Sequence, residues 1–134
     1  MHSGALPRLG VVIVSYNTEA ALRQCLRSLE AVEYPDFFTV VVDNASTDGS
    51  AEMVGREFPD VVLAEEKVNH GFAKGNNIGI RLALDKGAED LCLLNPDVVV
   101  SRGFLDPLVA VLEEDDTAML AAPTSERRSA SAAR

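Results

Sequence analysis

The fold is decided by the stretch VVIVSYNTEAALRQCLRSL at residues 11–29. Its first four residues form a β-branched run, which predicts a buried strand. Asn17 or Thr18 can then cap a helix, because apolar residues begin to recur at the spacing of one helical face. These apolar residues are Leu22, Cys25, Leu26 and Leu29. The stretch therefore predicts a strand followed directly by an amphipathic helix.

The same alternation continues along the chain. Further strands are predicted at residues 39–42, 61–64, 91–94 and 118–122, with helices around 50–58, at 74–86 and from Asp106 onward. Gly87 stands where a left-handed helix cap is needed. Strands separated by helices favour right-handed crossovers, so we predict an α/β fold with a mostly parallel sheet and helices on both faces. We expect one domain over residues 1–122 and a disordered Ser/Ala/Arg tail over residues 123–134.

Composition narrows the partners and the location. The 134 residues carry 12 basic and 21 acidic side chains, a net charge of −9, which disfavours nucleic acid as a partner. A small anion remains compatible, since backbone N–H groups or a cation can hold it. Cys25 and Cys92 form neither a zinc motif nor a disulfide framework. No apolar run reaches the length of a signal peptide or membrane span, so we expect a cytoplasmic protein, with the inner membrane face as a second option.

Polar clusters follow four of the predicted strands: Ser15-Tyr16-Asn17, Asp43-Asn44, Asn69-His70-Gly71 and Asn95-Pro96-Asp97. Ligands of parallel α/β sheets bind at the carboxyl ends of strands, so these clusters are the candidate site. A dinucleotide fingerprint is absent from the first strand end, and the chain has no P-loop. A receiver-like signalling domain remains a weak alternative, because Ser15 and Tyr16 stand where its acidic pair is expected.

Two of these segments allow more than one interpretation. The glycines of residues 69–79 let a diphosphate approach the backbone, with Lys74 adding positive charge, or they let a helix pack tightly under the sheet. The turn at residues 95–97 presents the carboxylate of Asp97, which suits a cation that bridges phosphates and keeps several waters. Taken alone, that turn is a common sequence.

Taken together, four stretches resemble the family-2 glycosyltransferases, and most of all their rhamnosyltransferase-like branch. The stretches are VSYN at 14–17, VDNASTDGS at 42–50, NHGFAKGNNIG at 69–79 and LNPD at 94–97, in the family's order. The resemblance covers about residues 10–122. It implies a Rossmann-like GT-A fold that binds a nucleotide-diphospho-sugar and is truncated at its C-terminal side.

The resemblance also assigns roles to residues. The residues implied to bind the nucleotide-sugar are Ser15, Tyr16, Asn17, Asp43, Asn44, Asn69, Gly71, Phe72, Gly75, Asn76 and Asn95. Asp97 is implied to bind the metal, as the second Asp of the family's Asp-x-Asp motif does. Asn95 stands at the first Asp of that motif, so one carboxylate of the family pattern is missing.

By resemblance, the chain is part of a hexosyltransferase-type enzyme that uses a dTDP-, UDP- or GDP-sugar with Mg²⁺ or Mn²⁺. Transfer to a saccharide or lipid-linked acceptor is expected to invert the anomeric centre, with a base from an acceptor-binding half. No catalytic residue is assigned here, because that half would follow residue 122. The alternative is a non-catalytic nucleotide-binding or assembly module. We also expect an exposed sheet edge, with self-association as one outcome.

Overall fold

The computed structural model of the chain describes residues 6–114, 119–123 and 129–133. Strands and helices alternate through the first four strands, as predicted. The elements are β1 (Leu9–Ser15), α1 (Glu19–Glu30), β2 (Phe37–Asp43), α2 (Ser50–Glu57), β3 (Val62–Glu65), α3 (Phe72–Asp85), β4 (Asp90–Leu94), α4 (Leu105–Glu114), β5 (Met119–Pro123) and β6 (Ser129–Ala133).

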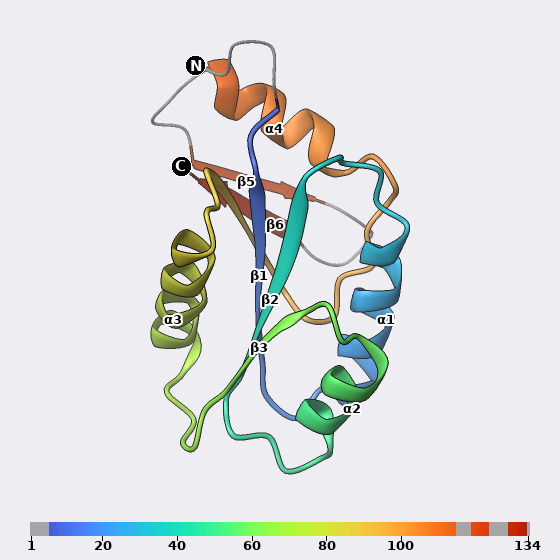
Figure 1. Cartoon of the computed structure of the whole chain (residues 1–134), viewed down its shortest axis with the longest axis vertical. Coiled ribbons are helices and arrows are strands. Elements are labelled where there is room, and N and C mark those ends of the chain that lie inside the picture. The colour runs from blue at the N-terminus through green and yellow to red at the C-terminus, as the bar shows by residue number, and fades with distance from the viewer. Residues whose placement is uncertain (1–5, 115–118, 124–128, 134) are drawn as a thin grey trace.

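One sheet in the order β3-β2-β1-β4-β6-β5 runs through the molecule. The pairs from β3 to β4 are parallel, and β6 joins β4 and β5 by antiparallel pairing. Figure 1 shows α3 on one side of the central strands and α1 with α2 on the other. The predicted α/β fold, mostly parallel in its sheet and covered on both faces, is therefore confirmed.

Strand β6 lies within the stretch that we expected to be a disordered tail. In the structure, β6 pairs with β4 from Leu91 opposite Ala133 to Leu94 opposite Ala130. The prediction missed this strand because SASAA contains no β-branched or aromatic residue, and sheet pairing uses backbone groups that every residue supplies.

Strand β1 shows why the sheet is buried on both faces. All seven of its residues are buried, and its side chains alternate between the two faces. Val11 and Ile13 join the core under α1, α2 and α4, whereas Val12 and Val14 join the core under α3. Burying such a side chain fully stabilises the fold by roughly 1.5–3 kcal/mol, so both layers hold the strand in place.

Helix α3 packs against the sheet at very close range. A Cβ atom added at Gly79 would lie 2.4 Å from Cγ1 of Val12, and one added at Gly75 would lie 2.8 Å from Cγ1 of Val14. These distances give Gly75 and Gly79 a packing role. After the helix, Gly87 has a φ of +95°, the left-handed conformation predicted for it.

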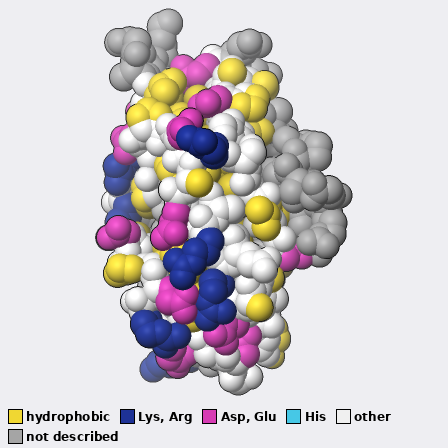
Figure 2. All heavy atoms as spheres, turned by 90° about the vertical axis from the view of Figure 1, so that its right-hand side faces the viewer, with side chains coloured by type: hydrophobic (Ala, Val, Ile, Leu, Met, Phe, Trp, Pro, Cys, Tyr) yellow, Lys and Arg dark blue, Asp and Glu magenta, His cyan; other side chains and the backbone are white. Residues whose placement is uncertain are grey.

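Ion pairs join α1 to α2 on the outer surface. Arg23 Nε lies 3.0 Å from Glu57 Oε1, Arg27 Nη2 lies 3.0 Å from the same oxygen, and Arg23 also pairs with Glu19. Figure 2 shows basic and acidic side chains gathered side by side on this face. The guanidinium of Arg23, through its hydrogen bond, is the main reason that the pKa of Glu57 is lowered.

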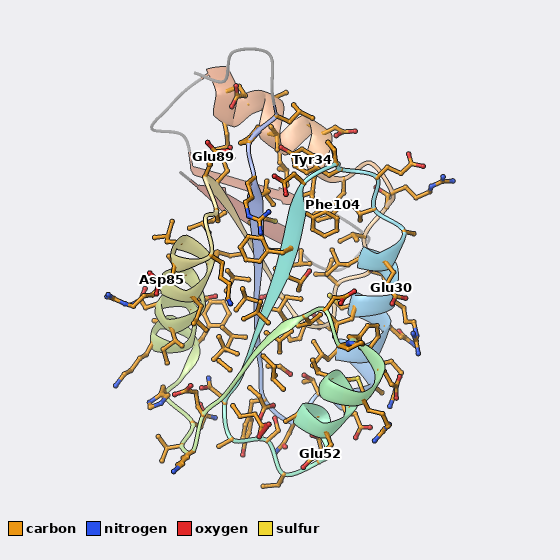
Figure 3. The ribbon with its side chains drawn as sticks, in the orientation of Figure 1. Glu30, Tyr34, Glu52, Asp85, Glu89 and Phe104 are labelled. Atoms are coloured by element: carbon orange, nitrogen blue, oxygen red, sulfur yellow. The ribbon has the colours of Figure 1, made fainter. Side chains whose placement is uncertain are left out.

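The amino ends of the strands are closed by packing. Tyr34 and Phe104 are both buried in the core, and Figure 3 shows them at the end of the molecule beside α4. The Tyr34 hydroxyl donates a hydrogen bond to the Pro7 carbonyl at 2.6 Å. The polar strand-end clusters therefore lie at the other end of the sheet. None of the helices within the described ranges is long and apolar enough to cross a membrane.

Candidate functional site

The strand register brings the predicted motifs to one edge of the sheet, in the lower part of Figure 1. Ser15 pairs with Asp43, and Asp43 pairs with Glu65, so three strands end at the same level. Leu94 pairs with Ile13, two residues before the end of β1. The turn that follows Leu94 therefore lies beside the carboxyl end of β1.

The start of α1 is capped by a residue from another loop. Thr18 holds the N-cap position, but its hydroxyl lies 2.8 Å from that of Ser15 and makes no cap hydrogen bond. The carboxylate of Asp48 accepts the Glu19 N–H at 3.0 Å and the Ser50 N–H at 3.0 Å. The Ser50 hydroxyl is the main cause of the lowered pKa of Asp48. Asp48 thus joins the first turns of α1 and α2.

Two strand-end loops are locked together at Asn17. Its N–H donates to Ser46 Oγ at 2.9 Å, and its Oδ1 accepts the Thr47 N–H at 2.8 Å. Asn17 and Ala45 both have positive φ, 51° and 66°, which is unfavourable for alanine. Tyr16, next to this link, is 49% exposed and so presents its ring to solvent at the site.

Asp43 is the most unusual group at this edge. Its side chain is buried, with only 3% exposed. Oδ2 accepts the Ser46 N–H at 3.1 Å, whereas Oδ1 is buried and has no hydrogen-bond partner among the described residues. Buried polar atoms are nearly always hydrogen-bonded, so this acceptor suits a donor supplied by a ligand.

Asn44 ties three segments to one another. Its N–H donates to the Ser15 carbonyl at 2.9 Å, and its Nδ2 donates to the Gly71 carbonyl at 3.1 Å. Its Oδ1 accepts the His70 N–H at 3.4 Å. Asn44 is only 2% exposed, so it holds these segments in place from within the protein.

The glycine-rich segment divides into an exposed part and a buried part. Asn69 Oδ1 accepts the Gly71 N–H at 2.8 Å, and Gly71, with a φ of +85°, leads into α3. Phe72 follows with 61% of its surface exposed, whereas Gly75 and Asn76 are buried. A ligand at this edge would meet Phe72 and the first turn of α3, with Gly75 and Asn76 behind them.

The Asn95-Pro96-Asp97 turn is partly exposed and packs against α1. The Asn95 carbonyl accepts the Val98 N–H at 3.3 Å and the Cys25 thiol at 4.0 Å. Burial of the thiol, and then the charge of Asp97, raise the pKa of Cys25 to about 12. The carboxylate of Asp97 therefore lies near the buried face of α1.

A metal at this turn would need ligands in addition to Asp97. Within the described residues, no three His, Cys, Asp or Glu side chains gather as a metal site. One carboxylate on a rigid turn fits a cation that bridges phosphates, since Mg²⁺ keeps several waters and takes substrate oxygens. Asp97 is the residue that would hold such an ion.

Several residues that shape the site carry no clear signal in the sequence. Ser46 and Asp48 lie in the stretch at residues 42–50, where the resemblance assigned roles only to Asp43 and Asn44. Glu66 donates its N–H to the Asp43 carbonyl at 2.9 Å, and its carboxylate lies 3.1 Å from Nε2 of His70. The Glu66–Asp43 contact depends on the assembled sheet, so no local pattern predicts it.

Comparison with known proteins assigns the class that this geometry suggests. The family model described as glycosyl transferase family 2 matches residues 10–131. The chain therefore belongs to glycosyl transferase family 2, as its motifs predicted.

Two relatives are each 30% identical to the chain. One is the low-salt glycan biosynthesis hexosyltransferase Agl10 of Haloferax volcanii, matched over 79% of this chain and 33% of its own length. The other is the dTDP-rhamnosyl transferase RfbF of Shigella flexneri, matched over 84% of this chain and 36% of its own length. The chain thus spans about a third of the length of these relatives.

Solved structures agree with the fold. The mannosyltransferase PcManGT from Pyrobaculum calidifontis, in complex with GDP-Man and Mn²⁺, aligns with a TM-score of 0.81 and 27% identity over 91% of this chain and 37% of its own. TarS 1-349 of S. aureus, in complex with UDP-GlcNAc, aligns with a TM-score of 0.74 and 24% identity over 88% of this chain and 34% of its own. The likeness to TarS concerns the fold alone.

Proposed function

We propose that this chain binds a nucleotide-diphosphate sugar at the carboxyl ends of β1, β2 and β4, as the donor-binding part of an inverting glycosyltransferase. The observation that carries the proposal is Asp43, whose buried Oδ1 has no hydrogen-bond partner among the described residues. A base N–H or a ribose hydroxyl would supply the missing donor. Uracil, thymine and guanine all carry an imino N–H, in keeping with a UDP-, dTDP- or GDP-sugar.

The exposed aromatic rings support the same ligand. Tyr16 and Phe72 stand at the ends of two segments that Asn44 joins, and both expose about half of their surface or more. An exposed ring beside a polar site suits stacking against a base or a sugar face. Ser15, Asn17, Asn44, Asn69, Gly71, Gly75, Asn76 and Asn95 complete the proposed donor site.

We place the divalent metal, Mg²⁺ or Mn²⁺, at Asp97. The Mn²⁺ and GDP-Man bound by PcManGT support this assignment, together with the resemblance of the turn to the family's metal motif. When bound, such an ion stabilises the negative charge that develops on the leaving diphosphate. Asp97 would orient the ion and the diphosphate, while Asn95 contributes an amide where the family pattern has a carboxylate.

Calorimetric titration tests this proposal. We expect UDP, GDP or dTDP to bind the parent chain and to bind more tightly with Mn²⁺ present. Asp97→Asn should weaken the metal-dependent part of binding while the thermal unfolding curve keeps its shape, because a partly exposed carboxylate is replaced by a group of the same size. The proposal fails if none of the three nucleotides binds, and Asp97 is only a turn residue if the variant binds Mn²⁺ and nucleotide as the parent does.

Turnover separates the enzyme from the binding module. With matching donor sugars and Mn²⁺, release of nucleotide diphosphate would indicate that the chain supports donor cleavage. Tight binding without any release would favour the non-catalytic module. The general base remains unassigned among the described residues.

A further inference from the structure

The backbone that leaves the Asn95-Pro96-Asp97 turn is neither helix nor strand from residue 98 to residue 100. Val98 and Val100 are buried in the core with α1, whereas Val99 is 44% exposed. The N–H groups of a buried segment outside helices and strands need partners elsewhere, and the Val98 N–H finds one in the Asn95 carbonyl within the turn. The Val100 N–H needs a partner from another part of the chain. Such a partner then fixes the position of the Asn95-Pro96-Asp97 turn that precedes this segment.

Ser28 is that partner. The Val100 N–H donates to Ser28 Oγ at 3.1 Å, and the Ser28 hydroxyl donates to the Cys25 carbonyl at 2.7 Å. A hydroxyl has a single proton, so the bond to Cys25 leaves the oxygen lone pairs of Ser28 for Val100. Helix α1 therefore fixes the direction in which the Ser28 oxygen accepts a hydrogen bond.

The same helix face also contacts the other side of the turn. The Cys25 thiol donates to the Asn95 carbonyl at 4.0 Å, one helical turn before Ser28. Further along, the Glu33 N–H donates to the Arg102 carbonyl at 3.0 Å. The carboxylate of Asp97 thus sits on a short span of backbone that α1 holds both before and after it.

We propose that Ser28 is a positioning residue for Asp97, which keeps this carboxylate in place for the divalent cation of the donor diphosphate. The proposal rests on the proposed function, and Ser28 itself touches neither metal nor nucleotide. Cations such as Mn²⁺ accept a narrow range of ligand geometry, so a loosened turn weakens metal binding more than base binding. Loss of the hydroxyl leaves the buried Val100 N–H without its acceptor and frees the backbone beside Asp97.

The experiment compares Ser28→Ala with Ser28→Thr, which keeps a hydroxyl able to bond the preceding turn of a helix. Leu82→Ala is the matched control, because Leu82 packs in the core on the opposite face of the sheet. Each full-length variant is titrated with UDP, GDP and dTDP, with and without Mn²⁺. Amide hydrogen exchange at Val100 is measured by NMR without any ligand, so the contact is tested independently of the site.

Ser28→Ala should speed exchange at Val100 and reduce the Mn²⁺-dependent gain in nucleotide affinity by roughly tenfold, with metal-free affinity unchanged. Ser28→Thr should keep the parent's gain, and Leu82→Ala should lose thermal stability without losing the gain. The positioning role is overturned if Ser28→Ala keeps the full gain, or if Leu82→Ala loses it equally. If Ser28→Ala speeds exchange at Val100 but the parent chain itself gains no nucleotide affinity from Mn²⁺, the proposed metal function is overturned and, with it, this role.

Discussion

Replacing Gly79 by alanine tests the close packing of α3 that carries the glycine-rich segment to the site. The added Cβ would lie 2.4 Å from Cγ1 of Val12 and 3.2 Å from Cγ2 of Val42. The first distance is 1.0 Å short of 3.4 Å, where ordinary contact begins. Val12 is fully buried on a strand paired on both sides, so it has no room to move away.

The size of the effect follows from two opposing contributions. Overpacking a core costs about 1–3 kcal/mol, and the severe overlap at Gly79 places this site near the upper end. Alanine regains about 1 kcal/mol of helix propensity over glycine. The free energy of unfolding should therefore fall by about 2 kcal/mol, which corresponds to a drop in Tm of roughly 8 °C for a chain of this size.

Gly55→Ala is the matched control. Gly55 lies in α2, and an added Cβ there meets nothing within 4 Å, so only helix propensity acts. We expect a gain of about 1 kcal/mol and a Tm roughly 4 °C higher. Urea and thermal unfolding by circular dichroism measure both variants. If Gly79→Ala equals the parent in stability, the packing distance of α3 is not limited by Gly79, and the steric argument is wrong.

Three other predictions concern the site and the surface. Asp43→Asn should weaken nucleotide binding by roughly 10- to 100-fold, since a hydrogen bond to a charged group is worth about 1.5–3 kcal/mol. Unchanged affinity in calorimetry would exclude Asp43 Oδ1 as a ligand contact. The pKa of Glu57 is lowered in the folded chain, so its charge stabilises the fold fully above the ordinary pKa of 4.5 and less as the pH falls below that value. Glu57→Gln should therefore lower Tm at pH 7, and the difference from the parent should shrink below pH 4.5; a difference independent of pH would refute this. Strands β3 and β5 end the sheet, so light scattering over a concentration series should show self-association, and a constant mass would contradict it.

Much of the fold could be predicted from periodicity. Strand β1 and helix α1 were predicted from residues 11–29, and the left-handed φ of Gly87 was predicted from its position after a helix. Helix α3 begins two residues earlier than predicted, at Phe72, because Gly71 ends the loop. Local sequence predicts such features well, since each depends on neighbouring residues in the chain.

The remaining features depend on the assembled sheet. The sequence allowed Gly75 either a ligand or a packing role, and only the distance to Val14 shows the packing. Asp48 caps α1 from a different loop, and Ser28 accepts from Val100 across 72 positions of the chain. Ala45 adopts a positive φ that its residue type disfavours. None of these features produces a periodic or local pattern in the sequence.

The motifs identified the family, whereas the roles of individual residues remain predictions. Ser15 and Asp43 end their strands and Asn95 follows β4, and the register places these strand ends at one edge of the sheet. The unpaired oxygen of Asp43 could not be predicted, because pairing depends on every group that surrounds the carboxylate. That oxygen now gives the donor-site proposal a physical basis beyond resemblance.

Paramagnetic broadening by Mn²⁺ tests the central claim most directly. In ¹⁵N–¹H spectra of the chain with bound nucleotide, trace Mn²⁺ should first broaden the amides of residues 95–98 and then those at the ends of β1 and β2. Amides at the opposite end of the sheet, such as Glu89, should stay sharp. Broadening centred on the acidic side chains of α1 and α2, with the 95–98 turn unaffected, would contradict a metal-assisted donor site at Asp97.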